Sequence, residues 1–154
     1  MTAKVSKQIV RGLGLLIVML ASLSVAQDKH MGVATCASTV CHGNSTDKPD
    51  ANILHSEYVF WGQQDPHANT YQVLLSAESV RIANKLGIGR ADQAPVCLSC
   101  HTDYVPKSER GDRFQLSDGV GCEACHGGAE RWLSTHTEKG VGHKDNVAQG
   151  LRPL

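Results

Sequence analysis

The chain has 154 residues with 15 basic and 15 acidic side chains, and this length suits one small domain. Three of the basic residues lie within the first 26, so the rest of the chain is slightly acidic and offers no basic patch for nucleic acid. Aromatic residues make up only 5% of the chain, which makes it a poor candidate for a large hydrocarbon core. A small domain of this kind completes its interior with disulfides, a metal or another staple, and a cofactor would serve the same purpose.

The first 26 residues have the pattern of an export signal. Basic residues precede an apolar run at 12–26 that ends in the small residues typical of a cleavage site. The run is shorter than the ~20 residues that a membrane-spanning helix requires. We therefore expect a cleaved signal peptide at 1–26 and a periplasmic domain at 27–154, with no stable membrane anchor after cleavage. The alternative is an uncleaved N-terminal anchor.

Helical periodicity predicts two helices in the middle of the chain. Apolar residues recur at intervals of three to four over 52–63, which indicates a short helix. The pair Asp65-Pro66 is typical of a capping residue followed by proline at the first helical position, and predicts a helix that runs to about Leu86 and stops at Gly87. Its expected apolar stripe consists of Val73, Ala77, Val80 and Ala83.

The C-terminal part of the chain predicts loops and short elements. A polar loop is expected at 107–119 and another short helix at 129–137, while His143 lies in a glycine-rich segment expected to turn. No segment has the alternating pattern of a strand. The predicted fold class is therefore mainly α, with short helices, long loops and little or no β-sheet.

One motif occurs three times, as CASTVCH at 36–42, CLSCH at 97–101 and CEACH at 122–126. The last two have the spacing of c-type haem attachment, in which two thiols form thioethers with the haem vinyl groups and the histidine binds iron. Residues three and four apart on a helical turn share a face, so the three side chains can converge on one haem. The motifs predict thioether roles for Cys36, Cys41, Cys97, Cys100, Cys122 and Cys125, and proximal iron ligation by His42, His101 and His126.

Two other interpretations of the six cysteines remain open. A zinc site would use the two Cys-x-x-Cys pairs, whose separation lies just beyond the usual range. Alternatively, six exported cysteines would form three disulfides. Neither interpretation asks for a histidine after every second cysteine. The first motif is the irregular one, because four residues separate its cysteines, and without haem Cys36 and Cys41 would suit a small disulfide loop.

Five further histidines are candidates for the sixth iron ligand. In decreasing order of preference they are His67, His55, His136, His143 and His30. His67 is first because the predicted helix start would aim it, and His30 is last because it lies near the new N-terminus. Met31 is the only methionine left after signal cleavage, so we expect bis-histidine ligation and low reduction potentials for most of the haems.

These segments together resemble the multihaem cytochromes of the cytochrome c-554 family. The resemblance rests on CASTVCHG, HSEYVFWGQQDPHANTYQVLL, CLSCH and GVGCEACHGGAERWLSTH. It implies covalent haems in closely packed pairs, mostly bis-histidine iron, periplasmic electron transfer, and ligand roles for His67 and His136. The chain departs from the family in its extended first motif and in stopping at Leu154, where similar proteins continue into another motif. We therefore expect 27–154 to be a trihaem domain or the N-terminal part of a longer multihaem unit.

The sequence favours an electron carrier over an enzyme. Three covalent haems c would stay bound through redox cycles, and closely packed haems would provide a path between donor and acceptor proteins. The expected function is therefore periplasmic electron transfer between redox partner proteins. One alternative is a reductase of a small nitrogen oxide, which requires one iron with an open position. Another is a haem-bearing module of a larger electron-transfer complex.

Overall fold

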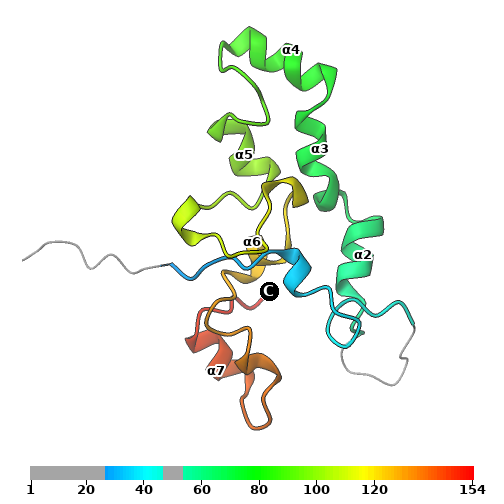
Figure 1. The fold of residues 1–154 in the computed structure, drawn as a ribbon, viewed down its shortest axis with the longest axis vertical. Coiled ribbons are helices and arrows are strands. Elements are labelled where there is room, and N and C mark those ends of the chain that lie inside the picture. The colour runs from blue at the N-terminus through cyan, green and yellow to red at the C-terminus, as the bar shows by residue number, and fades with distance from the viewer. Residues whose placement is uncertain (1–26, 47–53) are drawn as a thin grey trace, which may run out of the picture.

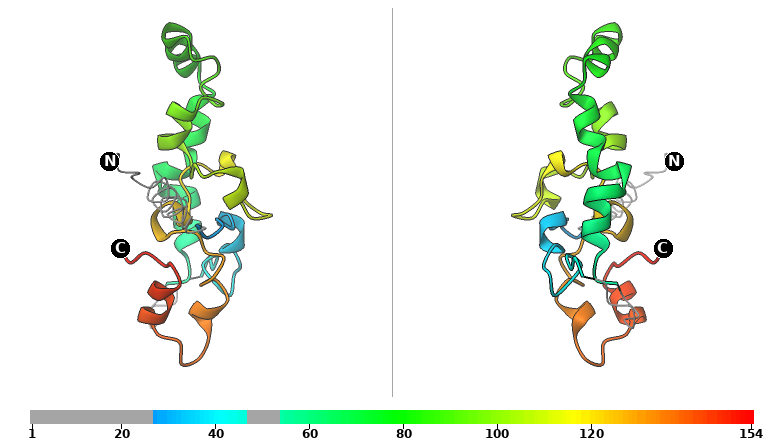
Figure 2. Two further views of the ribbon diagram at one scale, coloured as in Figure 1. Left: turned by 90° about the vertical axis from the view of Figure 1, so that its left-hand side faces the viewer. Right: turned by 90° about the vertical axis from the view of Figure 1, so that its right-hand side faces the viewer.

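The computed structural model describes residues 27–46 and 54–154, so the expected signal peptide at 1–26 lies outside the described residues. The described part is elongated and built of short helices joined by loops, with α4 and α7 at opposite ends (Figure 1). Side views show that the body is narrow, with the helices strung along its long axis (Figure 2). Within these residues there is no β-strand, and a single bridge pairs His30 with Arg110. The mainly α prediction is confirmed.

The elements follow one another in a simple order. The α-helices are α2 (Glu57–Gln64), α3 (Thr70–Leu74), α4 (Ala77–Leu86), α5 (Pro95–His101), α6 (Cys122–His126) and α7 (His143–Ala148). Short 3-10 turns are η2 (Val33–Thr35), η3 (Pro66–Asn69), η4 (Lys107–Glu109), η5 (Leu116–Asp118) and η6 (Thr135–Thr137). In the described ranges, no helix is long and apolar enough to cross a membrane.

The helix predicted from Pro66 to Leu86 is broken into η3, α3 and α4, so this prediction is wrong in its continuity. Ser76 takes an extended backbone, with φ −68° and ψ 155°, and its hydroxyl accepts the N–H of Ser79 at 3.2 Å. A serine that caps a new helix in this way ends the preceding one. Of the predicted apolar stripe only Ala83 is buried. Val73 and Val80 are 49% and 51% exposed, and Ala77 is also exposed.

The ends of two other predicted helices also differ from the structure. The first short helix begins only at Glu57, so His55 precedes it, with a left-handed φ of 59° that non-glycine residues rarely adopt. The helix predicted at 129–137 is reduced to turns and η6. Two helical bonds remain in it, from the Leu133 N–H to the Ala129 carbonyl at 2.8 Å and from the His136 N–H to the Trp132 carbonyl at 2.9 Å.

Glycines mark the other helix boundaries. Gly87 ends α4 in the left-handed conformation, with φ 64°, as the sequence predicted. His143 was expected in a turn but starts α7, because the Asp145 carboxylate accepts the N–H of Gly142 at 2.8 Å and caps the helix. A side chain three residues downstream thus converts the predicted turn into a helix start.

The protein core is small, as the composition predicted. The buried apolar residues are Val33, Leu74, Ala83, Ala91, Ala94, Leu98, Ala129 and Trp132, and half of these are alanine. A cluster of Leu74, Ala83 and Leu98 joins α3, α4 and α5 into what we call the upper arm (Figure 1). Elsewhere, large apolar side chains such as Phe60 and Val96 are more than half exposed. So little buried hydrocarbon is typical of a domain that a cofactor completes.

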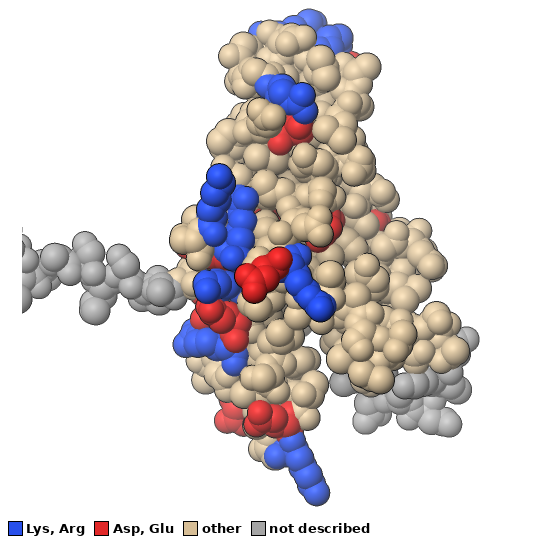
Figure 3. Space-filling view, in the orientation of Figure 1, with Lys and Arg blue, Asp and Glu red and all other residues tan. Residues whose placement is uncertain are grey.

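The surface has a mixed charge pattern. On the face seen in Figure 3, basic and acidic side chains are interleaved over the middle and lower part of the molecule. The surface over α2 and α3 carries few charged side chains in the same view. This largely uncharged surface covers the helices that precede the second motif.

Candidate functional site

The first motif forms a tight turn in which the extra residues bulge outward. The His42 N–H donates to the Cys36 carbonyl at 3.2 Å, which closes the turn, while residues 38–40 are exposed. Gly43 is required here, since a Cβ on it would lie only 1.9 Å from the carbonyl oxygen of Ala37. The four-residue spacing therefore leaves both cysteines and the histidine of the motif close together.

The second and third motifs each form a helical turn. α5 begins with Pro95 at its first position and ends with His101, and α6 consists of the third motif itself. Side chains three and four apart therefore share a face in both motifs, as the spacing predicted. α5 packs against α3, where the ring of His101 meets the Thr70 carbonyl oxygen, with Nδ1 at 3.1 Å.

The first and third motifs meet although they are far apart in the sequence. They share a cavity of about 210 Å³, lined by Cys36, His42, Glu57, Tyr58, Cys122, His126, Trp132, His136 and Leu151. The thiols of Cys36 and Cys122 influence each other: their interaction raises the pKa of Cys36 and lowers the pKa of Cys122. We call this space the shared cavity.

His42 lies close to two other histidine rings. Its ring centre is 6.4 Å from that of His136, with the planes 9° from parallel, and 6.3 Å from that of His55, with the planes 35° apart. Two imidazoles that bind one iron from opposite sides, each at about 2 Å, place their ring centres on the order of 6 Å apart. Both neighbours therefore have a spacing that suits the ligand opposite His42, although one iron can take only one of them.

Five of the eight histidines form a hydrogen bond through Nδ1, and Nδ1 of His67 makes a close ionic contact. The partners are Asp103 Oδ2 for His30 (2.6 Å), Glu57 Oε2 for His42 (2.9 Å), the Cys41 carbonyl for His55 (2.7 Å), Asp65 Oδ1 for His67 (2.9 Å), the Thr70 carbonyl for His101 (3.1 Å) and the Leu133 carbonyl for His136 (2.6 Å). Among the described residues, Nε2 of these rings has no hydrogen-bond partner. Metal-binding histidines use this arrangement, because a bond at one nitrogen fixes the ring and leaves the other for the metal.

The candidates for the sixth ligand differ in exposure. The side chain of His67 is 61% exposed at the start of η3, and His143 is exposed at the start of α7. His30, ranked last from the sequence, is only 9% exposed. Burial lowers the pKa of His30. The hydrogen bond and the charge of Asp103 raise it by more than burial lowers it, so the pKa is raised overall. His30 is thus a buried partner of Asp103 and not a loose terminal residue.

Glu123, inside the third motif, has a role that the sequence did not reveal. The residue is 3% exposed, and its carboxylate accepts backbone N–H groups from Met31 (2.7 Å), Gly32 (2.6 Å) and Ala129 (2.8 Å). The residue thereby ties the N-terminal segment and the chain after α6 to the third motif. No local pattern signals this role, because the three donors come from segments outside the motif.

Neither the disulfide arrangement nor the zinc arrangement of the cysteines is present among the described residues. All six cysteines have free thiols, so the Cys36–Cys41 disulfide loop is absent. The described part of the chain contains no group of three or more His, Cys, Asp or Glu side chains arranged to hold a metal ion. The Cys-x-x-Cys pairs therefore do not converge as a zinc site requires.

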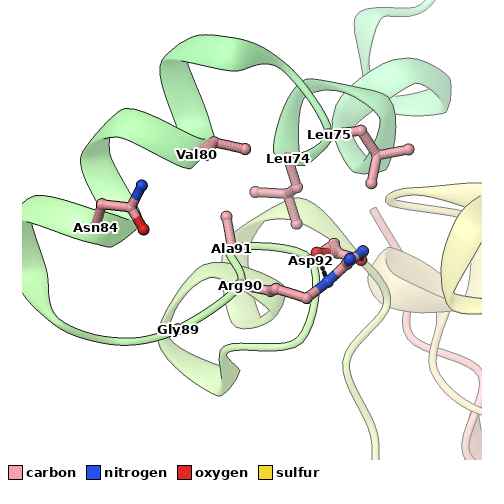
Figure 4. Close-up of a pocket in the computed structure, with 8 residues that line it drawn as sticks. All are labelled: Leu74, Leu75, Val80, Asn84, Gly89, Arg90, Ala91 and Asp92. Carbon is pink, nitrogen blue, oxygen red and sulfur yellow. Dashed lines mark hydrogen bonds and ion pairs between the residues drawn. The ribbon is translucent and has the colours of Figure 1, made fainter.

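The upper arm contains a second cavity, of about 410 Å³ (Figure 4). Its lining consists of Leu74, Leu75, Val80, Asn84, Gly89, Arg90, Ala91 and Asp92, with an ion pair between Arg90 and Asp92 at 2.6 Å. This lining has no histidine or cysteine, so the cavity offers neither thioether nor iron ligand.

The site thus has three pairs of free thiols, each followed by a histidine, and histidine rings whose spacing suits an iron between them. This donor set fits covalently bound haem. In a comparison with protein families, residues 35–127 match the family described as cytochrome c554 and c-prime, which covers more than half of the chain. The chain belongs to this family. It is therefore a c-type cytochrome that carries covalent haem and takes part in electron transfer between redox partners, and such cytochromes are generally exported.

The family match covers only part of this cytochrome, residues 35–127. It contains all three motifs together with His55 and His67, whereas His30, His136 and His143 lie outside it. Among curated proteins, none matches this chain. A search of solved structures also gave no match. The geometry around His136 is therefore independent support for a role of that residue.

Proposed function

We propose that this cytochrome is a periplasmic trihaem electron carrier, with residues 27–154 as its haem domain. The observation that carries the proposal is the shared cavity, where the first and third motifs contact each other through Cys36 and Cys122. Thioethers at these two positions would bring two haems close together. Closely placed haems pass electrons readily, which suits a carrier between a donor and an acceptor protein.

We assign the iron ligands from the same geometry. His42, His101 and His126 are the proximal ligands, and His136 is the ligand opposite His42, because its ring centre lies 6.4 Å away and both rings line the shared cavity. His55 is the competitor for that position. The distal ligands of the other two irons come from the remaining histidines, with His67 the first candidate. Mostly bis-histidine iron would leave no open position for a substrate.

The protein residues and the haem contribute differently to the function. When bound, haem supplies the one-electron chemistry of its iron. Glu57 and the Thr70 carbonyl orient His42 and His101 through their Nδ1 atoms. Tyr58, Trp132 and Leu151 contribute apolar surface to the lining of the shared cavity. Burial and ligand orientation are the means by which a protein tunes haem potentials.

The decisive experiment is intact mass spectrometry with electron paramagnetic resonance on protein made in a host with haem c maturation. Three haems per chain and only low-spin ferric signals are expected. A count of two or fewer would overturn the trihaem proposal. A high-spin signal that shifts on adding nitric oxide, together with turnover, would replace the carrier with the nitrogen oxide reductase considered from the sequence. Size measurement of the same sample tests the alternative of a larger complex.

Matched variants test the individual assignments. Changing both Cys36 and Cys41 to alanine is expected to lower the haem count to two, while the other attachment sites stay intact. H136A is expected to convert the iron of His42 to high spin, whereas H55A is expected to leave that iron low-spin. The opposite result for the two histidine variants would assign His55 to the iron of His42.

A further inference from the structure

The two tryptophans of the chain differ in the state of their indole N–H groups. Trp61 Nε1 donates to the Val120 carbonyl oxygen at 2.9 Å. Trp132 is only 7% exposed, and its Nε1 is buried without a hydrogen-bond partner in the described part of the chain. Buried donors in folded proteins are almost always paired, because leaving one unpaired is costly. We therefore expect the Trp132 N–H to have a hydrogen-bond acceptor that the described residues do not supply.

The position of Trp132 indicates where that acceptor lies. The residue lines the shared cavity together with His42, His126 and His136. Its ring stands edge-on to the ring of His136, with centres 5.5 Å apart and planes at 89°. Among the described residues, Glu57 is the only carboxylate that lines this cavity, and its Oε2 already lies 2.9 Å from His42 Nδ1. The described part of the cavity wall thus gives the indole no free carboxylate.

A haem in this cavity would bring a suitable acceptor with it. The pyrrole nitrogens of haem bind the iron, and in c-type haem the vinyl groups are used by cysteines, so the two propionate carboxylates are its hydrogen-bond acceptors. We propose that the Trp132 indole N–H donates a hydrogen bond to a propionate of a haem in the shared cavity. Trp132 is then a positioning residue for that haem. This inference rests on the proposed function, which places haem in the cavity.

The bond has a predictable effect on reduction. A propionate carries negative charge close to the iron and disfavours the added electron. An N–H that donates to the carboxylate offsets part of this charge, as hydrogen bonds around a metal site commonly do. Removing the donor should therefore lower the reduction potential of the haem that it contacts and leave the others nearly unchanged.

The direct test is nuclear magnetic resonance of the fully reduced, low-spin holoprotein with ¹⁵N-labelled tryptophan. W61F assigns the two indole signals. The Trp132 indole proton is expected to show a nuclear Overhauser effect to propionate methylene protons of one haem and slow exchange with solvent. Trp61, which is already bonded to Val120, is expected to show no propionate contact. This measurement uses the native Trp132 and does not depend on a variant that folds.

The second test compares W132F with W61F by potentiometric titration followed optically. W132F should retain three haems and low-spin iron and should lower one of the three potentials, whereas W61F should leave all three unchanged. Unchanged potentials in W132F, or the absence of the propionate contact in the native protein, would overturn the inference. A native protein with fewer than three haems would instead overturn the proposed function, so the two failures are distinguishable.

Discussion

The second motif and the other two motifs are supported in different ways. α5, which carries the second motif, packs against α3 over an aliphatic cluster that includes Leu74 and Leu98. The first and third motifs line the shared cavity, and buried polar groups such as Glu123 and the His30–Asp103 pair hold the chain around them. The same attachment sequence is thus supported by an apolar cluster in one region and by buried hydrogen-bonded polar groups in the other.

This difference indicates what each region needs in order to fold. An aliphatic cluster stabilises without any partner, because its burial is non-directional. A buried carboxylate or ion pair stabilises only when every donor and acceptor is in place. The region of the shared cavity should therefore be sensitive to single polar substitutions, and the upper arm to loss of hydrocarbon.

The largest effect is expected from E123A in the third motif. The change removes the acceptor of three backbone N–H groups and leaves them buried, which should lower the free energy of unfolding by about 4 kcal/mol. Denaturant unfolding of the holoprotein, followed by circular dichroism, measures this. E138A is the control, because Glu138 is exposed and should be nearly neutral.

Hydrogen exchange shows whether the effect of E123A is confined to its own region. Amides at 30–33 and 127–131 should lose protection, while those of α3 and α4 should keep it. Equal loss in the upper arm would contradict the separation of the two regions.

L74A is expected to have the next largest effect, in the upper arm. Leu74 is 4% exposed, and truncating a buried leucine to alanine costs about 3 kcal/mol through lost burial and the cavity left behind. The neighbouring L75A is the matched control, since Leu75 is 47% exposed and should lose much less. The potentials of haems at the first and third motifs should be unchanged in both variants. A shift in those potentials would show that the upper arm and the shared cavity are coupled.

These contrasts also show how far the sequence predicts the molecule. The mainly α fold and the helical turns at the second and third motifs follow from local signals: glycine stops, a proline start and cysteine spacing. The break at Ser76 was missed, because one serine outweighed a continuous helical pattern. The role of Glu123 depends on donors outside its motif, two of them far away in the sequence at Met31 and Gly32, and local patterns do not reveal such contacts.

The sixth ligands stay a prediction. The sequence favours His67 from its place at a helix start, and its side chain is 61% exposed, whereas packing of distant segments brings the His136 ring within 6.4 Å of that of His42. His30 was ranked last because of its position near the terminus, but it is buried against Asp103. The ranking rested on sequence neighbours, while the spacing of rings is set by how distant segments pack.

D103N should reveal the ion pair of His30 through pH. The raised pKa of His30 means that its stabilising contribution is fully present below its ordinary value of 6.5 and is lost as the pH rises through the higher native value. Asp103 and Glu123 raise this pKa, and Arg152 lowers it. At pH 6 the variant should be about 2 kcal/mol less stable than the native protein, with a smaller difference at alkaline pH. Unfolding curves from pH 5 to about pH 9 measure the profile.

The pH profile also discriminates between two roles of His30. A stability difference between D103N and the native protein that does not vary with pH would contradict a titrating ion pair. Such a result, with a new high-spin signal in H30A, would move His30 into the set of iron ligands. Low-spin iron in H30A, with the expected pH dependence, would keep it as a structural residue.

The smallest effects are expected from a pair of glycine variants, G87A and G62A. Gly87 has a left-handed φ of 64° and Gly62 lies within α2, and a Cβ at either position would meet nothing within 4 Å. Any change must therefore come from the backbone: G87A should cost about 1 kcal/mol, and G62A should gain about 0.5–1 kcal/mol through helix propensity. Thermal unfolding of the holoproteins measures both. Opposite signs at two open positions would show that backbone conformation alone ends α4; equal effects would mean that packing in the upper arm, and not Gly87, sets this boundary.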